Sequence, residues 1–234
     1  MEPTLKRIAF VTLLAYAALL PMLSSADELD YFKSLQPEWL QDYCVADRTS
    51  HIWVDGHVKC KNATHVRVAD FVYHGFLNNT PGATNNPNGV AIVPILVAQL
   101  PSLNGLNLGL ARHDFNIGGV VVPHLHPRAA EVLMVMQGSL YVGFVNSTNH
   151  LFATTITAGD LFVIPKGLIH FQMNVGTTPA MAMALFSSQN PGMSQVGRGL
   201  FGADPVIDDA VLMKGFKISQ HNVQFCKKNF NSTA

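Results

Sequence analysis

Two histidines and a glutamate interrupt the apolar segment GGVVVPHLHPRAAEVLMVMQG at residues 118–138. His124 and His126 are two residues apart, so in an extended strand both side chains leave the same face. Pro127 limits strand pairing and favours a bend, which lets Glu131 begin the next strand close to the two imidazoles. A buried polar group costs roughly 2–7 kcal/mol unless it is hydrogen-bonded or ligated. These three side chains therefore need a compensating partner.

His170 is the fourth candidate, in the segment GDLFVIPKGLIHFQMN, where it enters a strand after the Pro165–Gly167 turn. Three imidazoles and one carboxylate inside a barrel form a mixed nitrogen and oxygen site for a divalent transition metal. A His-x-His pair alone is more typical of an exposed strand face or of a hydrogen-bonded core histidine. The combination with Glu131 and His170 favours the metal, which supplies the compensation that burial requires.

Short apolar segments separated by glycine, proline and asparagine must position these four residues. They run from Val90 to Ser187, and their regular spacing predicts an antiparallel sandwich or barrel, an all-β fold with its core at about residues 65–190. The segment MQGSLYVGFV predicts a hairpin with its turn near Gly138. The segments are VAIVPILVAQL, LGLARHDFNIGGVVVPHLH, EVLMVMQGSLYVGFV, LFATTITAGDLFVIP, IHFQMNVG and AMAMALFSS.

Helical spacing replaces the strand pattern in the last part of the chain. The segments DDAVLMKGF and SQHNVQFCKKNF predict a C-terminal helical extension at about residues 205–230. Asp208 and Ser219 are suitable N-caps, and Gly215 is expected to break the helices apart.

The first 26 residues are typical of a secretory signal peptide. Lys6 and Arg7 precede the apolar stretch at residues 8–23, and small residues follow at 24–26. Pro21 and the length of the stretch argue against a membrane anchor, which needs about 20 apolar residues. We expect a signal peptide at 1–26 and a single secreted domain at 27–234, with no membrane anchor after cleavage.

Charge excludes several classes of partner. The chain has 15 Lys and Arg against 15 Asp and Glu, with no basic cluster, so we expect no nucleic-acid partner. Charged residues make up only 13% of the chain and hydrophobic ones 48%, which favours a protein whose surface is partly covered, as in an oligomer.

Three cysteines and four glycosylation sequons suit an oxidising, extracellular environment. Cys44 and Cys60 are close enough in sequence to close a local loop, but three cysteines allow three pairings. Cys226 shares a helical face with Val223 and Phe230 and is expected to be a buried free thiol. The sequons, each able to accept a glycan, are at Asn62, Asn78, Asn146 and Asn231.

The two metal-binding segments resemble the paired sequence boxes of plant germins, which belong to the cupin superfamily. The first box matches as Gly118, five residues, His124-Leu-His126, four residues, Glu131, six residues, Gly138. The second matches as Gly159, five residues, Pro165-Lys-Gly167, two residues, His170, three residues, Asn174. The segments DYCVAD and SSQNPG are also similar to germin-like proteins, so the resemblance spans essentially the whole mature chain.

The resemblance implies a cupin jelly-roll β-barrel with manganese (Mn²⁺) held by His124, His126, Glu131 and His170. It also implies a Cys44–Cys60 disulfide, a homohexamer built as a trimer of dimers, and secretion to the apoplast and cell wall. The bottom-up argument leads to the barrel, the four ligands and secretion, whereas manganese and the hexamer come from the resemblance alone.

The resemblance leaves three functions open. Germins that oxidise oxalate carry two asparagines in the pocket, but the matching positions here are Ala111 and Val121, so we expect weak or no oxalate oxidase activity. A manganese-dependent enzyme of superoxide-dismutase type needs no shaped polar pocket for its small-molecule substrate, and it is our first hypothesis. The alternatives are a non-catalytic defence or cell-wall glycoprotein with a structural metal, and a nucleotide-sugar pyrophosphatase/phosphodiesterase, for which no phosphate-binding loop is evident.

The other polar residues are expected to have structural roles. Arg128 lies beside the ligands, where a strand-end salt bridge is favoured over contact with an anion. The remaining histidines lack partners at ligand spacing and are expected to be surface or hydrogen-bonded residues. They are His51, His57, His65, His74, His113, His150 and His221.

Overall fold

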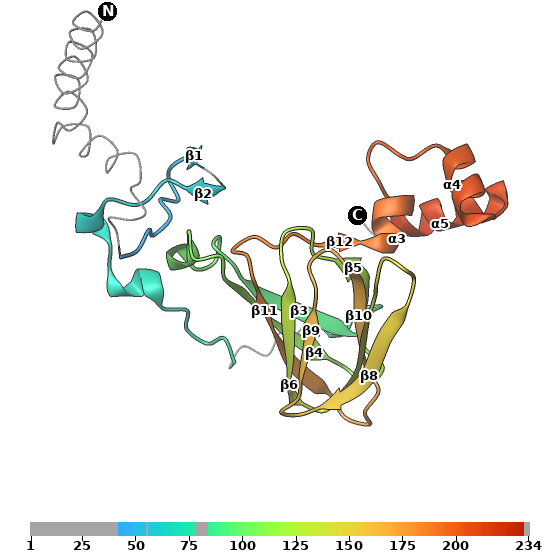
Figure 1. Cartoon of the computed structure of the whole chain (residues 1–234), viewed down its shortest axis with the longest axis horizontal. Coiled ribbons are helices and arrows are strands. Elements are labelled where there is room, and N and C mark those ends of the chain that lie inside the picture. The colour runs from blue at the N-terminus through green and yellow to red at the C-terminus, as the bar shows by residue number, and fades with distance from the viewer. Residues whose placement is uncertain (1–41, 55, 78–83, 232–234) are drawn as a thin grey trace, which may run out of the picture. The chain divides into compact units, whose positions relative to one another are not determined.

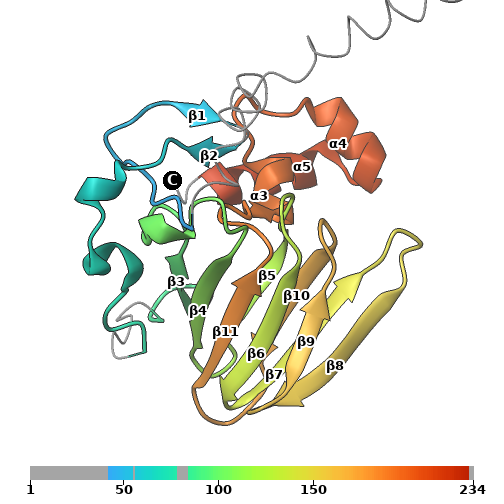
Figure 2. The ribbon, with the colours of Figure 1, turned by 60° about the vertical axis from the view of Figure 1, so that its left-hand side comes forward.

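Two five-stranded antiparallel sheets form the barrel in the computed structural model of the chain (Figure 1). One sheet has the order β12 (Ser194–Gln195), β5 (Val120–Leu125), β10 (Ile169–Asn174), β7 (Ser139–Val145) and β8 (Leu151–Thr157). The other has the order β3 (Val90–Ile95), β4 (Gly109–Phe115), β11 (Ala180–Phe186), β6 (Glu131–Gln137) and β9 (Leu161–Ile164). The expected all-β jelly roll is confirmed, and Figure 2 shows its strands from a second direction.

Side chains that alternate along the strands build the core between the sheets. In β6, Glu131, Leu133 and Val135 are buried while the residues between them are not. This period of two is what a sheet with one buried face requires. The cluster of buried apolar residues consists of Ala111, Phe115, Val121, Ala129, Leu133, Val135, Leu140, Val142, Ile156, Ala180, Ala182, Ala184 and Phe186.

The predicted hairpin near Gly138 is wrong, because β6 and β7 do not pair with each other. β6 pairs with β11 and β9, whereas β7 pairs with β10 and β8. Gly138 has a φ of 85° and lies so close to β11 that an added Cβ would be 2.6 Å from the Cβ of Ala180. The glycine therefore carries the chain from one sheet to the other, a change of partner that a local turn signal does not reveal.

The segment before the barrel contains only short elements. These are β1 (Trp53–Val54), β2 (His57–Val58) and the 3₁₀ helices η3 (Ala63–His65) and η4 (Val68–Phe71), with η5 (Pro101–Leu103) following β3. The two large sheets therefore begin at Val90, later than the barrel core expected from about residue 65.

Three helices follow β12 at the C-terminal end, as expected for a helical extension. They are α3 (Val196–Phe201), α4 (Asp209–Phe216) and α5 (Gln220–Asn231). Asp208 caps α4 by accepting from the N–H of Ala210 at 2.7 Å, and the Ser219 hydroxyl accepts from the N–H of Asn222 at 3.4 Å. The break expected at Gly215 occurs at Lys217 instead, whose φ of 56° ends α4 in a left-handed cap.

The structure describes residues 42–54, 56–77 and 84–231. The predicted signal peptide at 1–26 lies outside the described residues. Cys44 and Cys60 are disulfide-bonded, whereas Cys226 is a free, partly buried thiol. Among the described residues no helix has the length and apolar character needed to cross a membrane.

Candidate metal centre

The four residues predicted as metal ligands lie together in the structure. Each of His124, His126, Glu131 and His170 offers one ligand atom, and these atoms all lie within 4.8 Å of one another. All four residues are buried, with Glu131 and His170 each only 1% exposed. The structure therefore brings together in one place residues from segments that are far apart in the sequence.

Strand register explains how the cluster forms. β5 and β10 are neighbours, and His124 is the register partner of His170, so their ring centroids are 4.1 Å apart. His126 follows β5 directly, and its ring centroid is 5.1 Å from that of His124. Glu131 begins β6 in the other sheet. The cluster thus draws two imidazoles from one sheet, a third from the residue just after β5, and a carboxylate from the other sheet.

Backbone carbonyls fix the hydrogen positions on two of the imidazoles. Nδ1 of His124 lies 2.9 Å from the carbonyl oxygen of Val122, and Nδ1 of His170 lies 2.8 Å from that of Leu168. A carbonyl oxygen can only accept, so each Nδ1 carries the hydrogen and donates it. In the neutral ring this leaves the Nε2 lone pair free, which is the form that binds a metal.

His126 has the same arrangement with a more distant partner. Its Nδ1 donates to the carbonyl oxygen of Gly192, which is 66 residues further along the chain. The ring of His126 also packs edge-on against Phe186, with 4.7 Å between centroids. All three imidazoles therefore have Nε2 available for a cation.

The atoms at the centre of the cluster lack partners that would stabilise them. Oε2 of Glu131 lies 3.2 Å from Nε2 of both His126 and His170. Neither Glu131 Oε2 nor His170 Nε2 forms a hydrogen bond, although both atoms are buried. Because the ring hydrogens are on Nδ1, lone pairs on nitrogen face lone pairs on a carboxylate oxygen. A cation between them would satisfy both, so the donor set fits a divalent transition metal.

Ionisation in the cluster favours the same conclusion. Burial, reinforced by the neighbouring His170, lowers the pKa of His124 to about 3, which keeps this imidazole neutral. Burial alone would raise the pKa of Glu131, but a hydrogen on the facing Nε2 of His126 or His170 outweighs burial and lowers that pKa, and a cation in the same place would act in the same direction. Neutral imidazoles and an ionised carboxylate are the forms that coordinate a cation.

Gln172 is a polar neighbour of the cluster that sequence reasoning missed. It is fully buried, and its Nε2 donates to Oε1 of Glu131 at 3.4 Å, while its own Oε1 has no partner. Gln172 lies two residues after His170 on β10, so the period of a strand already placed it on the ligand face. At this length the bond orients the carboxylate only weakly.

His113 is buried, so it is not one of the surface residues that the sequence allowed for. It lies in β4 with only 3% of its surface exposed, packs edge-on against Phe115 and has no partner for Nδ1. Burial lowers its pKa, so the ring is neutral. His57 is partly buried and also has an unpartnered Nδ1. The five others are exposed as expected: His51, His65, His74, His150 and His221.

Ala111 and Val121, the positions that differ from oxalate-oxidising germins, belong to the apolar core cluster. Each is 2% exposed. Neither side chain offers a hydrogen bond to a ligand.

Arg128 forms hydrogen bonds in place of the salt bridge expected from the sequence. Its Nε donates to the carbonyl oxygen of Asn190 at 2.7 Å, and its Nη2 donates to Asn190 Oδ1 at 3.1 Å. Within the described part of the chain, the guanidinium is therefore bonded to an amide and a carbonyl, and the strand-end salt bridge is not found.

The sequons differ in what the structure describes of them. Asn62 is exposed and Asn146 half-buried, and in both the side-chain oxygen accepts from the threonine two residues later. Asn231 is the last residue of α5, and Asn78 lies outside the described residues. Glycosylation at all four positions stays a prediction.

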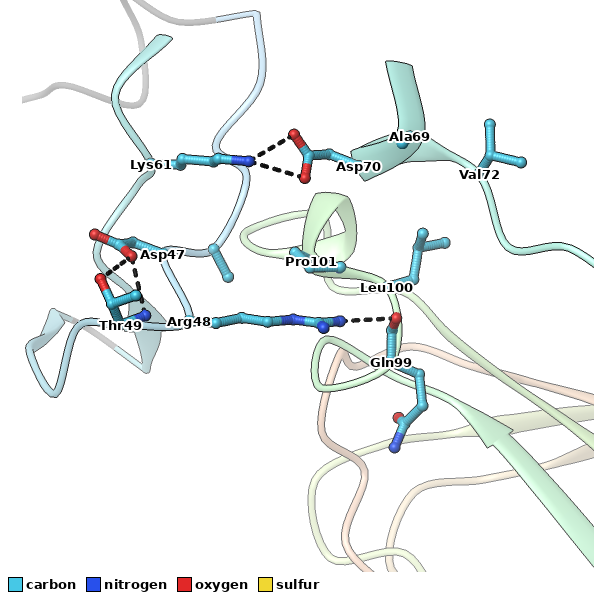
Figure 3. A pocket seen from close by; sticks show the side chains of 11 residues that line it. Asp47, Arg48, Thr49, Lys61, Ala69, Asp70, Val72, Gln99, Leu100 and Pro101 are labelled. Carbon is cyan, nitrogen blue, oxygen red and sulfur yellow. Dashed lines mark hydrogen bonds and ion pairs between the residues drawn. The ribbon is translucent and has the colours of Figure 1, made fainter. Parts of the chain in front are cut away.

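A cavity of about 410 Å³ lies apart from the metal cluster and is lined by residues of η4 and η5 (Figure 3). Its charged side chains are paired with nearby groups. Lys61 forms an ion pair with Asp70 at 2.9 Å, and Arg48 donates to the carbonyl oxygens of Ala98 and Gln99. The ion pair lies within the segment before the barrel, and the Arg48 bonds attach that segment to the loop after β3. These charged side chains therefore serve the structure, and the buried cluster is the candidate site.

Fold and site together define a cupin barrel with a candidate metal centre, and a family model agrees. The cupin family model, described as "Cupin", matches residues 76–224. Germin-like protein 4-1 of Oryza sativa subsp. japonica is 43% identical over 227 residues, which cover 95% of this chain and 85% of that protein. Germin-like protein subfamily 2 member 1 of Arabidopsis thaliana is 43% identical over 197 residues, covering 84% and 89%. The chain therefore belongs to the germin-like proteins of the cupin family.

A solved structure supports the same relationship. A recombinant oxalate oxidase in complex with glycolate superposes with a TM-score of 0.78 at 39% identity, covering 83% of this chain and 98% of that one. The similarity extends over nearly the whole of the related enzyme, so the barrel and its C-terminal extension are both shared.

Proposed function

We propose that this chain is a secreted germin-like glycoprotein that binds Mn²⁺ through His124, His126, Glu131 and His170. The observation that carries the proposal is the buried pair of unpartnered atoms, Glu131 Oε2 and His170 Nε2, whose lone pairs face one another. Such an arrangement is unfavourable by itself and becomes favourable around a cation.

The resemblance to germins supports manganese in particular. The donor set itself, three imidazoles and one carboxylate without a thiolate, suits several divalent transition metals, of which manganese is one. If the ion takes six ligands, the four protein ligands would leave two positions for water or substrate, which is a feature of catalytic rather than closed structural sites.

The proposed reaction is the dismutation of superoxide. Two superoxide ions and two protons give one O₂ and one H₂O₂, so one superoxide is oxidised and the other is reduced by one electron. Bound manganese supplies the one-electron redox chemistry. The chain's own histidines hold Nδ1–H toward backbone carbonyls. Ala111 and Val121 are apolar at the positions where oxalate-oxidising germins carry asparagines, which a diatomic ion tolerates.

The apolar side chains of Ala111 and Val121 argue against oxalate as substrate, although the related solved structure is an oxalate oxidase. Oxalate is a dianion that needs hydrogen-bond donors. Each lost bond to a charged group costs about 1.5–3 kcal/mol. Since Ala111 and Val121 donate none from their side chains, we expect weak or no oxalate oxidation.

Elemental analysis of the purified native protein, followed by superoxide and oxalate assays on the same sample, tests this proposal. We expect one manganese ion per chain, superoxide dismutation that a His170→Ala variant loses, and little peroxide from oxalate. Full metal content without superoxide turnover would overturn the enzymatic part and favour a structural ion. Robust peroxide production from oxalate would overturn the predicted specificity.

We further propose that copies of this chain assemble into a hexamer, a trimer of dimers. The outer face of the β3-β4-β11-β6-β9 sheet is apolar, with Leu185 41%, Leu161 58% and Val163 61% exposed. Val132, the partner of both Leu185 and Val163, continues this apolar row. An apolar face of this kind is typical of a protein–protein contact. Light scattering should give the hexamer mass, and a monomer at micromolar concentration would contradict it.

Secretion and glycosylation complete the proposal. The apolar stretch at residues 8–23 and the disulfide-bonded Cys44 and Cys60 support export to an oxidising extracellular space, such as the apoplast and cell wall. Mass spectrometry of the native protein should find a mature N-terminus after residue 26 and glycan on sequons such as Asn62. A chain that retains its first residues would contradict the export signal.

A further inference from the structure

The three imidazoles of the cluster are held in two different ways. His124 and His170 each donate from Nδ1 to a carbonyl oxygen two residues earlier in the chain, on the segment that carries the ligand itself. His126 lies beyond the end of β5 and donates to Gly192, in a loop that is distant in sequence. The orientation of His126 therefore depends on where that loop lies.

Arg128 holds the loop in place. Its backbone N–H donates to the carbonyl oxygen of Pro191 at 3.1 Å, Nε donates to that of Asn190 at 2.7 Å, and Nη2 donates to Asn190 Oδ1 at 3.1 Å. The guanidinium also lies against Gly192, where an added Cβ would come within 2.7 Å of Nη2 and 3.0 Å of Cζ. Gly192 has a φ of 67°, which a glycine adopts without strain.

We propose that Arg128 is a positioning residue of the metal centre, which fixes the Gly192 carbonyl and thereby the orientation and Nδ1–H form of His126. The inference rests on the proposed function, because it concerns a cation bound at the cluster. Arg128 follows His126 by two residues, so one short segment supplies a ligand and also holds the loop that orients it. Partners that orient a ligating histidine in this way raise its basicity and its affinity for the metal.

The same loop continues into the strand that pairs with β5. In β12, Ser194 pairs with Leu125 and Gln195 pairs with His124. The chain from Asn190 onward therefore returns beside His124 and the residue that precedes His126. If the loop shifts, His124 keeps its bond to the carbonyl of Val122, whereas His126 loses its bond to that of Gly192. A displacement of the loop would therefore change metal binding by reorienting His126.

Arg128 is exposed, which makes the proposal testable apart from folding. Exposed side chains contribute little to the free energy of unfolding. Arg128→Ala should therefore leave the melting temperature of the metal-free protein nearly unchanged, while it weakens Mn²⁺ binding by roughly 10–100-fold, the range for outer partners of metal ligands. Arg128→Lys should give an intermediate loss, because lysine keeps the charge but not the planar fork of donors.

Arg48 offers a matched control within the chain. It is also exposed, and it too donates to two backbone carbonyl oxygens, those of Ala98 and Gln99, both at 2.9 Å. Figure 3 shows the bond to Gln99. Arg48→Ala should leave Mn²⁺ affinity at the wild-type value.

The affinities of all variants are measured with Mn²⁺ alone, by competition against a chelator, on the full mature chain. The electron paramagnetic resonance spectrum of bound Mn²⁺ should change in Arg128→Ala and not in Arg48→Ala.

The outcomes separate this inference from the proposed function. If the wild type binds no Mn²⁺ at the cluster, the proposed function fails first. If the wild type binds one ion and Arg128→Ala binds it equally tightly with an unchanged spectrum, only the positioning role of Arg128 is overturned. A fall in the metal-free melting temperature that accounts for the weaker binding would likewise overturn it.

Asn190→Ala removes only the Oδ1 acceptor of the Arg128 guanidinium. It should show a smaller loss of Mn²⁺ affinity than Arg128→Ala, and an unchanged affinity would count against the proposal.

Discussion

The metal cluster has a locally organised half and a half organised by distant contacts. His124 and His170 are neighbours across β5 and β10, and each is oriented by a carbonyl two residues earlier. His126 is oriented by Gly192, whose position depends on Arg128. The comparison teaches that identical ligand types in one site can differ in how much of the fold is needed to hold them.

His113 extends the comparison to an imidazole with no such partner. It is as buried as the cluster histidines, yet no carbonyl faces its Nδ1. The ligand histidines each have a backbone acceptor on Nδ1 and a facing carboxylate or imidazole near Nε2. Burial alone therefore does not distinguish a ligand, whereas the pairing of Nδ1 with a carbonyl does.

The largest expected effect comes from removing a ligand of the locally organised half. His170→Ala deletes one of four donors, so its loss of Mn²⁺ affinity should exceed the roughly 100-fold limit typical of outer partners. The metal content of the dialysed variant, measured by elemental analysis, should fall close to zero. Met173→Ala, an exposed residue on the same strand, is the control and should retain the ion. Retention of one ion by His170→Ala would show that the cluster is not the site.

A smaller effect separates the two halves of the cluster. Gly192→Ala places a Cβ against the Arg128 guanidinium and at a strained φ, so it should displace the carbonyl that orients His126. We expect a loss of about tenfold in Mn²⁺ affinity, or about 1.4 kcal/mol. Val122→Ala and Leu168→Ala leave their backbone carbonyls in place and should bind Mn²⁺ normally. Equal losses in all three variants, measured by chelator competition, would remove the distinction between local and distant anchoring.

The smallest effect concerns the imidazole whose Nδ1 lacks a partner. His113→Val removes an unsatisfied buried polar atom, so the free energy of unfolding should rise by about 1 kcal/mol, measured with urea on the metal-free protein. A fall in that free energy would show that the ring's packing outweighs its unsatisfied nitrogen.

The same variant should alter the dependence of stability on pH. Burial lowers the pKa of His113, against the opposing charges of Glu131 and Asp114 and together with His126 and His170. The unfolded chain takes up a proton at the ordinary value near 6.5 while the folded chain does not, so stability falls as pH drops below that value. The wild type should lose more stability between neutral and mildly acidic pH than His113→Val. Parallel pH profiles for the two proteins would show that His113 is not held neutral by the fold.

Much of the site could be predicted because it follows from local geometry. The period of two along a strand puts His124 and His126 on one face, and Pro127 ends the strand so that Glu131 begins another. The cap at Asp208 is equally local. These features depend on residues within a few positions of each other, so the sequence pattern contains them.

The remaining features depend on contacts between distant segments. Nothing near Gly138 shows that β6 and β7 belong to different sheets, since their partners lie elsewhere in the chain. The bond from His126 to Gly192 spans 66 residues, and the place of His113 in the interior is set by its neighbours on β3 and β11. Gln172 is the exception, because strand period alone placed it beside the ligands.

Anomalous diffraction at the manganese absorption edge, from crystals of the native protein, tests the central claim most directly. The account predicts a single strong peak bounded by Nε2 of His124, His126 and His170 and by the carboxylate of Glu131. Fully loaded crystals with no peak among these four side chains, or with the peak at another place in the chain, would contradict it.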